Sequence, residues 1–211
     1  MKSTGMRLAG AIVAAGLLAA SARASMLSFE SVEGNEGLGA YSGTMEWQRP
    51  GKDEGCGMLL VTLWNESPEE NGGFLTGFAF RVTDGLLLTY LGDNTASGDS
   101  WEHISNVNAH PYGMYDFGAA IGGNWLGGGS PHAGIAAGGM KAFAFEVCGD
   151  PTLLESVDAF DFFDETEGYG FVARFKGFED GGSDKVPAVA PGPGALALTV
   201  VGGIALRRRM R

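Results

Sequence analysis

The side chains best suited to catalysis or metal binding are scarce in this chain. Its only histidines are His103, His110 and His132, and the first two are seven residues apart in a polar stretch. A zinc site needs three or four ligands at tight spacing, such as two histidines one helical turn apart, and this spacing does not offer that. No G-x-S-x-G sequence is present to expose a nucleophilic serine. We therefore expect loop histidines rather than a Ser-His-Asp triad, and no enzymatic activity.

Acidic side chains offer a second kind of chemistry. The densest acidic cluster consists of Asp158, Asp161, Asp164, Glu165 and Glu167. Calcium is bound by closely spaced oxygens, so the three aspartates are weak candidates for a calcium site. The D-x-D-x-D-G loop pattern is absent, however, and phenylalanines at 160, 162 and 163 interrupt the cluster. The simpler interpretation is an edge segment whose phenylalanines face the core and whose carboxylates face water. The stretch 180–184 is interpreted first as a glycine turn.

Aromatic residues in a glycine-rich stretch suggest a third chemistry, carbohydrate binding. Residues 112–139 include ten glycines, a composition that favours long loops at one edge of the fold. If they are exposed there, Tyr112, Tyr115 and Trp125 could stack on sugar rings as apolar platforms with a polar rim. The alternative is that these rings fill the core beneath the loops.

The two cysteines, Cys56 and Cys148, lie at the ends of predicted strands. Cys56 comes just before an apolar strand at 58–64, and Cys148 follows an alternating strand at 141–147. If these strands are antiparallel neighbours, the two cysteines meet and can form a disulfide in an oxidising compartment. Two unpaired thiols are the alternative, and the sequence suggests no cofactor.

The elements that must position these residues are mostly strands. Alternation of aromatic and small or polar residues, as in 76–82, 141–147 and 170–178, is typical of half-buried antiparallel strands. Further strands are predicted at 26–32, 58–64 and 86–91. The one helix signal is Asp150 as N-cap followed by Pro151. The pattern predicts an all-β, antiparallel β-sandwich, jelly-roll-like, with long glycine-rich loops.

The charge is divided between basic ends and an acidic body. The 211 residues include 36 glycines and have a net charge of −11. Three of the 14 basic residues lie in residues 1–24 and four in the last five, so seven remain against all 25 acidic residues, a net of −18. Nucleic-acid binding requires clustered Lys and Arg to neutralise phosphates, so we expect no nucleic-acid partner.

The N-terminal stretch, residues 1–24, has the pattern of a secretory signal. A basic start precedes an apolar segment at 8–20, and Ala22 and Ala24 flank a small-x-small cleavage site for signal peptidase. The apolar segment, a predicted signal helix, is too short for a membrane span of about 20 residues. An uncleaved anchor helix is the alternative. We expect the body to begin at Ser25 and to be exported.

The C-terminal stretch, residues 187–211, repeats this polarity in reverse. Val186-Pro187 opens a Pro/Gly/Ala linker that we expect to be neither helix nor central strand, so the body is predicted as 25–186. A short apolar helix is predicted at 195–206, and a basic cluster ends the chain at Arg207, Arg208, Arg209 and Arg211. This pattern suits a transient inner-membrane anchor. A permanent weak anchor or a frayed tail is the alternative.

The residues Pro191, Gly192, Pro193 and Gly194, followed by the apolar run and the arginines, resemble the C-terminal sorting signal of PEP-CTERM proteins. In that family a Pro-Glu-Pro motif precedes the apolar helix, and here Gly192 replaces the Glu. The resemblance implies recognition by an exosortase in Gram-negative bacteria that make exopolysaccharide. Segments 125–129 and 171–187 are similar to parts of uncharacterised proteins with this tail, which implies no catalytic residues.

These observations favour an exported, non-enzymatic protein of the cell envelope or extracellular matrix, with exosortase and signal peptidase as partners during export. Association with exopolysaccharide is part of this interpretation. One alternative is a carbohydrate-binding module that uses the loop aromatics. A second is a polysaccharide hydrolase, which would need two carboxylates facing a cleft about 5–10 Å apart.

Overall fold

The computed structural model describes residues 24–51, 54–94, 101–126 and 129–190, and within them it is almost entirely β structure. The strands are β1 (Ala24–Ser31), β2 (Tyr41–Gln48), β3 (Cys56–Asn65), β4 (Gly72–Phe80), β5 (Leu87–Asp93), β6 (Trp101–Asn108), β7 (Met114–Ile121), β8 (Ile135–Ala136), β9 (Met140–Cys148), β10 (Phe171–Phe178) and β11 (Ser183–Val189). The helices are α1 (Pro151–Ser156) and three short 3₁₀ turns, η1 (Glu69–Asn71), η2 (Pro131–Ala133) and η3 (Ala159–Phe162).

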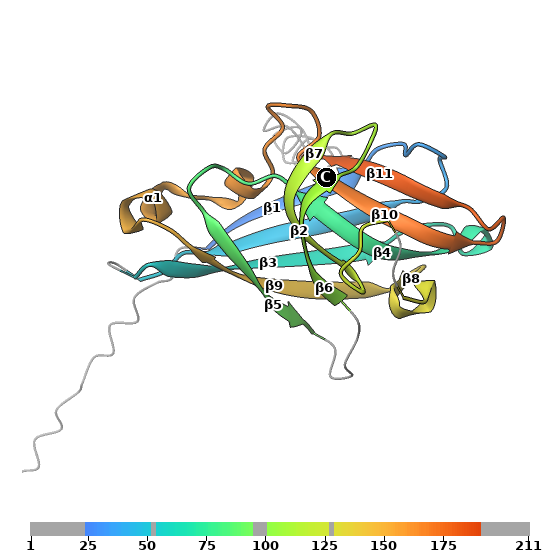
Figure 1. Cartoon of the computed structure of the whole chain (residues 1–211), viewed down its shortest axis with the longest axis horizontal. Coiled ribbons are helices and arrows are strands. Elements are labelled where there is room, and N and C mark those ends of the chain that lie inside the picture. Colours follow the sequence, from blue (N-terminus) through green and yellow to red (C-terminus); the bar gives the residue numbers. More distant parts are fainter. Residues whose placement is uncertain (1–23, 52–53, 95–100, 127–128, 191–211) are drawn as a thin grey trace, which may run out of the picture.

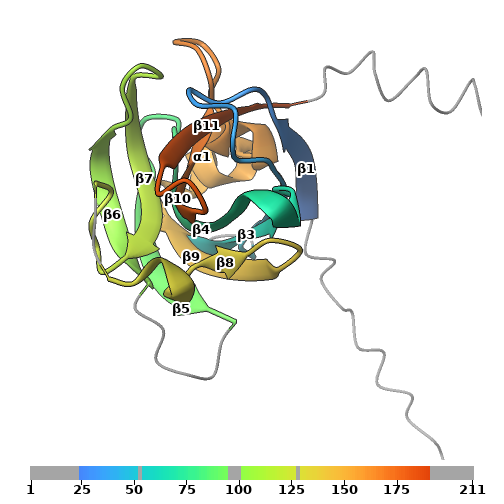
Figure 2. The same ribbon diagram turned by 90° about the vertical axis from the view of Figure 1, so that its right-hand side faces the viewer.

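The strands form one continuous antiparallel sheet. Its order is β5-β9-β3-β2-β1-β11-β10-β4-β7-β6, and β8 pairs with β4. The sheet curls around a common interior, which brings its end strands β5 and β6 close together (Figures 1 and 2). The predicted all-β, antiparallel fold is confirmed. In place of the two sheets of a jelly-roll-like sandwich, the structure has one barrel-like sheet, because hydrogen bonding continues from each strand of this path to the next.

The six strands predicted from the sequence correspond to β1, β3, β4, β5, β9 and β10. The predicted helix start is also confirmed, because the Asp150 carboxylate accepts the Thr152 N–H at 2.8 Å and Pro151 is the first residue of α1. Strands β2, β6, β7, β8 and β11 were not predicted. Strands β7 and β8 lie inside 112–139, where long loops were expected.

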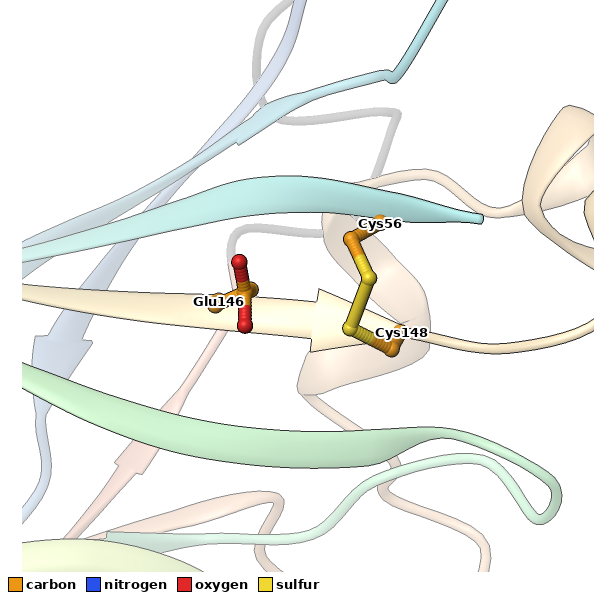
Figure 3. Close-up of side chains that lie close together, drawn as sticks. All are labelled: Cys56, Glu146 and Cys148. Atoms are coloured by element: carbon orange, nitrogen blue, oxygen red, sulfur yellow. A yellow bond between two sulfur atoms is a disulfide. The ribbon is translucent and has the colours of Figure 1, made fainter. Parts of the chain in front are cut away.

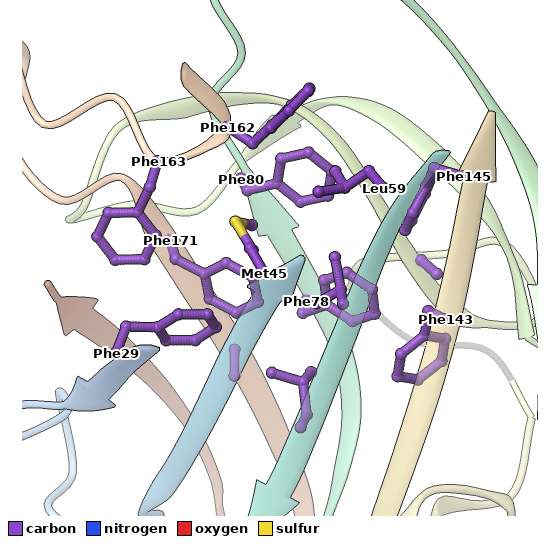
Figure 4. Packing of buried hydrophobic residues seen from close by; sticks show 14 of the residues in the cluster. Phe29, Met45, Leu59, Phe78, Phe80, Phe143, Phe145, Phe162, Phe163 and Phe171 are labelled. Carbon is purple, nitrogen blue, oxygen red and sulfur yellow. The ribbon is translucent and has the colours of Figure 1, made fainter. Parts of the chain in front are cut away.

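Alternating aromatic residues fill the interior of the curled sheet. Phe171 is fully buried, and its ring centroid lies 4.6 Å from that of Phe29 and 5.6 Å from that of Phe78. Figure 4 shows rings from β1, β4, β9 and β10 meeting in this space. Buried aromatic rings contribute large apolar areas and favourable edge contacts, so this interior supplies most of the stabilisation of the fold.

A second cluster lies on the outer face of β10, β4, β7 and β6, and we call it the outer cluster. Its position follows from alternation: Val172 and Ala79 belong to it, whereas their neighbours Phe171 and Phe78 face the interior. Both faces of β4 and β10 are therefore buried at this point. The outer cluster consists of Ala79, Ile104, Val107, Ala109, Tyr115, Ala120, Trp125 and Val172.

Strand β11 corrects the predicted boundary between body and tail. Pro187 was expected to exclude a central strand, yet it pairs with Val172 in β11, between β1 and β10. Its carbonyl accepts the Val32 N–H at 2.9 Å. In an antiparallel strand, the N–H and the C=O of one residue point to the same side. The N–H that Pro187 lacks would therefore point toward β1, at the position where the β1–β11 pairing ends. The folded body therefore extends to Val189.

Candidate functional site

Cys56 and Cys148 stand directly opposite each other on β3 and β9 and are joined by a disulfide (Figure 3). The Glu146 carboxylate is close by, and the Cys56, Glu146 and Cys148 ligand atoms lie within 4.8 Å of one another. Metal ions bind the thiolate form of cysteine, so two sulfurs bonded to each other leave only Glu146 as a ligand. Within the described residues this is the only such group of three. The disulfide therefore serves as a covalent link between β3 and β9.

The three candidate calcium ligands each hold a turn of the backbone. Asp158 accepts the Phe160 N–H and Asp161 accepts the Asp158 N–H, both at 2.8 Å, which forms a reciprocal cap on η3. Asp164 accepts the Thr166 N–H at 2.8 Å, and this hydrogen bond lowers the pKa of Asp164. Although all three aspartates are described, their carboxylates do not converge into a ligand group.

The phenylalanines among these aspartates only partly follow the prediction. Phe162 and Phe163 are buried in the interior, as expected, whereas Phe160 is 55% exposed. The segment therefore anchors itself to the core by two rings and uses its carboxylates as caps. Two of its three phenylalanines thus face the core, as the solvated-edge interpretation expected.

Two of the three predicted sugar-contacting rings are buried. Tyr115 is 1% exposed and Trp125 is 7% exposed, and both belong to the outer cluster. The Arg81 guanidinium lies 5.0 Å over the Tyr115 ring. Tyr112 is partly buried, and its ring meets that of Tyr169 edge-on at 5.7 Å. Buried rings cannot stack on a sugar, so Tyr115 and Trp125 are where the alternative interpretation placed them, in a core beneath the surface.

The three histidines lie apart and pack against rings or loops. His103 stacks on Phe117, with 5.5 Å between ring centroids, and His132 meets Phe74 edge-on at 4.7 Å. His110 lies in the loop after β6, where its N–H donates to the Asn108 side chain. None of the hydrogen bonds between described residues joins a serine hydroxyl or a carboxylate to a histidine ring. No nucleophile and base are paired in this part of the chain.

Two adjoining hollows flank β6 and form a candidate binding surface, which we call the β6 groove. Their volumes are about 310 and 440 Å³, and His103, Ser105 and Asn106 line both. Asn106 has a φ of 52°, in the left-handed region that non-glycine residues rarely adopt, so the backbone is strained where the hollows meet. Asp116 and Phe117 are among the other residues that line the first hollow, and Asn124, Trp125 and Leu126 are among those that line the second.

The chemistry of the β6 groove suits a hydroxylated ligand. It offers amide, hydroxyl and carboxylate groups beside the stacked rings of His103 and Phe117, the combination that orients a sugar by hydrogen bonds and a ring face. The Asp116 carboxylate is held in place because it accepts the Val82 N–H at 2.9 Å. Sequence reasoning missed this surface because β6 buries Trp101, Ile104 and Val107, a period of three that does not indicate a strand.

Sequence reasoning also missed the role of Asp184, which lay in an apparent glycine turn. Asp184 is 2% exposed and its two oxygens accept the N–H groups of Glu36 at 3.0 Å, Leu38 at 2.9 Å and Gly39 at 3.2 Å. It therefore fixes the loop between β1 and β2. Its neighbour Lys185 faces the other side of β11, as do Arg174 and Lys176 on β10.

The sorting residues Pro191, Gly192, Pro193, Gly194, Arg207, Arg208 and Arg209 lie outside the described residues, as does Ala22. Ala24 is the first residue of β1, and Ser25 accepts the Ala159 N–H through its hydroxyl at 2.9 Å. In the part of the chain that the structure describes, no helix has the length and hydrophobicity that a membrane crossing requires. Comparison with family models, curated proteins and solved structures finds no match to this chain.

Proposed function

We propose that this chain is an exported, non-enzymatic protein of the cell envelope or extracellular matrix. In this proposal residues 1–24 direct export, an exosortase-type enzyme recognises the C-terminal signal, and the mature body associates with exopolysaccharide. The observation that carries the proposal is the Cys56–Cys148 disulfide, because such bonds persist in oxidising compartments outside the cytosol.

A structural role fits the way the body uses its carboxylates. Asp158 and Asp161 cap η3, Asp184 holds the β1–β2 loop, and Asp116 accepts the Val82 N–H. Groups that could have served as acids, bases or ligands are thus engaged in holding backbone. The excess of acidic residues on the body keeps it soluble and self-repelling, which suits a component of a hydrated matrix.

Titration of thiols tests the export half of the proposal. Protein recovered from the cell envelope and unfolded without reductant should titrate no free thiol, and the Cys56→Ser variant should titrate one. Two thiols in the unmodified chain would mean that it matures in a reducing compartment, and the export proposal would then fail.

Truncation and fractionation test the sorting half. A variant that ends at Ala190 keeps all of β11 and should fold but leave the envelope fraction. Ending the chain at Val186 instead removes the Pro187–Val172 pairing, so unfolding would obscure the result. Gly192→Glu, which restores Pro-Glu-Pro, should increase processing of the tail. Unchanged fractionation of the Ala190 variant would overturn the sorting proposal.

Carbohydrate binding in the β6 groove is a second candidate function, favoured by the stacked His103 and Phe117 rings beside polar groups. His103→Ala and Asn106→Ala should abolish binding to an array of neutral oligosaccharides. Tyr115→Phe, a change within the buried outer cluster, should leave that binding unchanged. An array without signal for the unmodified protein would count against this candidate.

The hydrolase alternative predicts cleavage of a bound polysaccharide in addition to binding. Asp84 and Asp116 both line the first hollow, so they are the carboxylates that such an enzyme would use. Release of reducing ends from a bound polysaccharide, lost in Asp116→Asn, would replace the binding candidate with the hydrolase. Binding without release favours a module that only binds.

A further inference from the structure

Three cations gather on the outer face of β10 and β11 in a body that is otherwise acidic. Arg174 and Lys185 are cross-strand partners, and Lys176 follows Arg174 by two residues on the same face. Directly opposed side chains of an antiparallel pair have Cβ atoms about 4.5–5.5 Å apart. We call Arg174, Lys176 and Lys185 the basic row. It accounts for three of the seven basic residues between residues 25 and 206.

The basic row has no acidic partner among the residues that the structure describes. Among the described residues, no carboxylate lies within 4.0 Å of any of the three charged groups, since the one ion pair there joins Lys141 to Asp93. The adjacent carboxylate, Asp184, is buried on the inner side of β11 and already accepts three N–H groups. The Lys185 ammonium donates to the backbone oxygen of His110, a neutral acceptor. Three like charges therefore stand together without a counter-ion from the described chain.

Two donors of Arg174 are also unsatisfied. Arg174 is half-buried, and its Nε and Nη1 atoms are shielded from solvent without a hydrogen-bond partner. A buried donor without an acceptor costs about 1–3 kcal/mol, and more when it is charged. Beyond Arg174 the next residues across the sheet are Gly77 on β4 and Ala120 on β7. Both are small and buried, and neither offers a side-chain acceptor to the guanidinium.

The electrostatics agree with this geometry. Burial lowers the pKa of Arg174, and burial together with the Arg174 charge lowers the pKa of both Lys176 and Lys185. The three charges thus repel one another and are partly desolvated. An anion placed among them would relieve the repulsion, because the Arg174 Nη2 atom and the two ammonium groups can donate charge-assisted hydrogen bonds to its oxygens.

We propose that the basic row is a binding site for the acidic groups of an anionic polysaccharide, carboxylates or sulfates carried on sugar residues. The choice of a polysaccharide rests on the proposed function, which delivers the protein to an exopolysaccharide layer. The row lies on β10–β11, whereas the β6 groove lies along β6, so the body has two separate surfaces for carbohydrate: one for charge and one for hydroxyl groups.

Binding to defined polymers tests the proposal. The full chain is titrated with polygalacturonate, dextran sulfate and unmodified dextran at about 0.15 M salt, where the Debye length of about 8 Å screens repulsion from remote carboxylates. The two acidic polymers should bind and the neutral dextran should not. Arg174→Gln and Lys185→Gln should each weaken binding about tenfold, the loss expected for one charge-assisted hydrogen bond. Lys176→Arg keeps the charge and should bind as the unmodified chain does.

A matched control separates local contacts from net charge. Arg49→Gln removes the same charge at the end of β2, where Arg49 donates to the Val157 carbonyl at 3.0 Å, and it should leave polymer binding unchanged. Thermal unfolding of each variant verifies that it is folded. Equal loss in Arg49→Gln and Arg174→Gln, or equal binding of neutral and acidic dextrans, would overturn the site.

The source of the anion and the proposed function are tested separately. If 10-fold excess inorganic sulfate over the polymer's acidic groups displaces polygalacturonate completely, the site takes free anions and the polysaccharide assignment is overturned. If the polymer persists, the assignment stands. Polymer binding by a chain that fractionation places in the cytosol would overturn the proposed function and leave the site intact. An exported chain that ignores acidic polymers would overturn the site alone.

Discussion

The inner and outer faces of β10 differ in how completely the chain supplies hydrogen-bond partners for the polar groups there. On the inner face, Phe171 and Phe175 are fully buried among other rings, and even the polar Tyr41 nearby donates to the Val186 carbonyl at 3.2 Å. On the outer face, Arg174 keeps shielded donors without acceptors. The inner face is complete without any other molecule. The outer face is not, because two Arg174 donors lack an acceptor there.

The largest effect should come from the inner face. Phe171→Ala removes a ring that packs against Phe29, Phe78 and other interior rings, and should lower the free energy of unfolding by about 3–5 kcal/mol. Val172→Ala, equally buried but in the outer cluster, should cost only about 1–2 kcal/mol because it removes two methyl groups. Denaturant unfolding measures both. If Val172→Ala costs as much as Phe171→Ala, the interior is not the main source of stability.

The second effect tests the polar partners of the inner face. Asp184→Asn keeps the shape but leaves one oxygen to accept the N–H groups of Glu36, Leu38 and Gly39, so at least one N–H loses its acceptor. We expect a loss of about 1–3 kcal/mol in unfolding free energy, measured by denaturant titration. Asp180→Asn, in the exposed β10–β11 turn, is the control and should change stability by less than about 0.5 kcal/mol. Similar values for both would remove the structural role of Asp184.

The inner face was also the part that the sequence could predict. The alternation of Phe171, Ala173 and Phe175 with polar neighbours identified β10, because packing against one interior imposes a period of two. Strand β6 was missed since it turns its buried residues to two different clusters, Trp101 inward and Ile104 outward. Strand β11 was missed because Asp184 and Pro187 are unusual in a central strand. Both depend on tertiary partners that a local pattern does not contain.

The same limit applies to the candidate sites. Placing Cys56 and Cys148 at the ends of two strands was enough to bring them together, because register follows from strand pairing. Tyr115 and Trp125 looked like loop aromatics because glycine surrounds them, and only the curling of the sheet buries them. Arg174 and Lys176 of the basic row alternate within the predicted strand 170–178, but Lys185 lies on β11, which was not predicted. Their lack of counter-ions depends on where Asp184 points.

The third effect compares two buried tyrosine hydroxyls at alkaline pH, that of Tyr41 in the interior and that of Tyr115 in the outer cluster. Burial raises the pKa of Tyr41 well above its ordinary value of 10, and raises that of Tyr115 to about 12 although the Arg81 charge opposes this. Between pH 10 and 12 the unfolded chain loses these protons and the folded chain keeps them. Stability should therefore fall as pH rises, by about 1.4 kcal/mol per pH unit for each fully titrating group.

Phenylalanine variants assign this slope to its groups. Tyr115→Phe and Tyr41→Phe should each flatten the fall in unfolding free energy between pH 10 and 12. Above pH 12 only Tyr41→Phe should still do so, because the folded Tyr115 titrates there as well. Denaturant unfolding at fixed ionic strength measures the slopes, and an unchanged slope in Tyr41→Phe would show that its hydroxyl is not buried.

The smallest effect on stability should have the opposite sign. Arg174→Met keeps the aliphatic packing of the side chain but removes two shielded donors and a charge that repels Lys176 and Lys185. The free energy of unfolding should stay equal or rise by up to about 1 kcal/mol, since a desolvated charge without a partner is unfavourable. The pKa of both lysines should rise toward the ordinary value, which an NMR titration of their side chains would detect.

Arg81→Met supplies the contrast, because the Arg81 Nε donates to the Met114 carbonyl at 3.0 Å and its guanidinium covers the Tyr115 ring. That variant should lose about 1–2 kcal/mol of stability. If Arg174→Met is as stable as the unmodified chain but binds acidic polymers more weakly, Arg174 is retained for ligand binding. Packing alone would not preserve an unfavourable charge. If Arg174→Met loses as much stability as Arg81→Met, Arg174 serves the fold, and the difference between the two faces of β10 disappears.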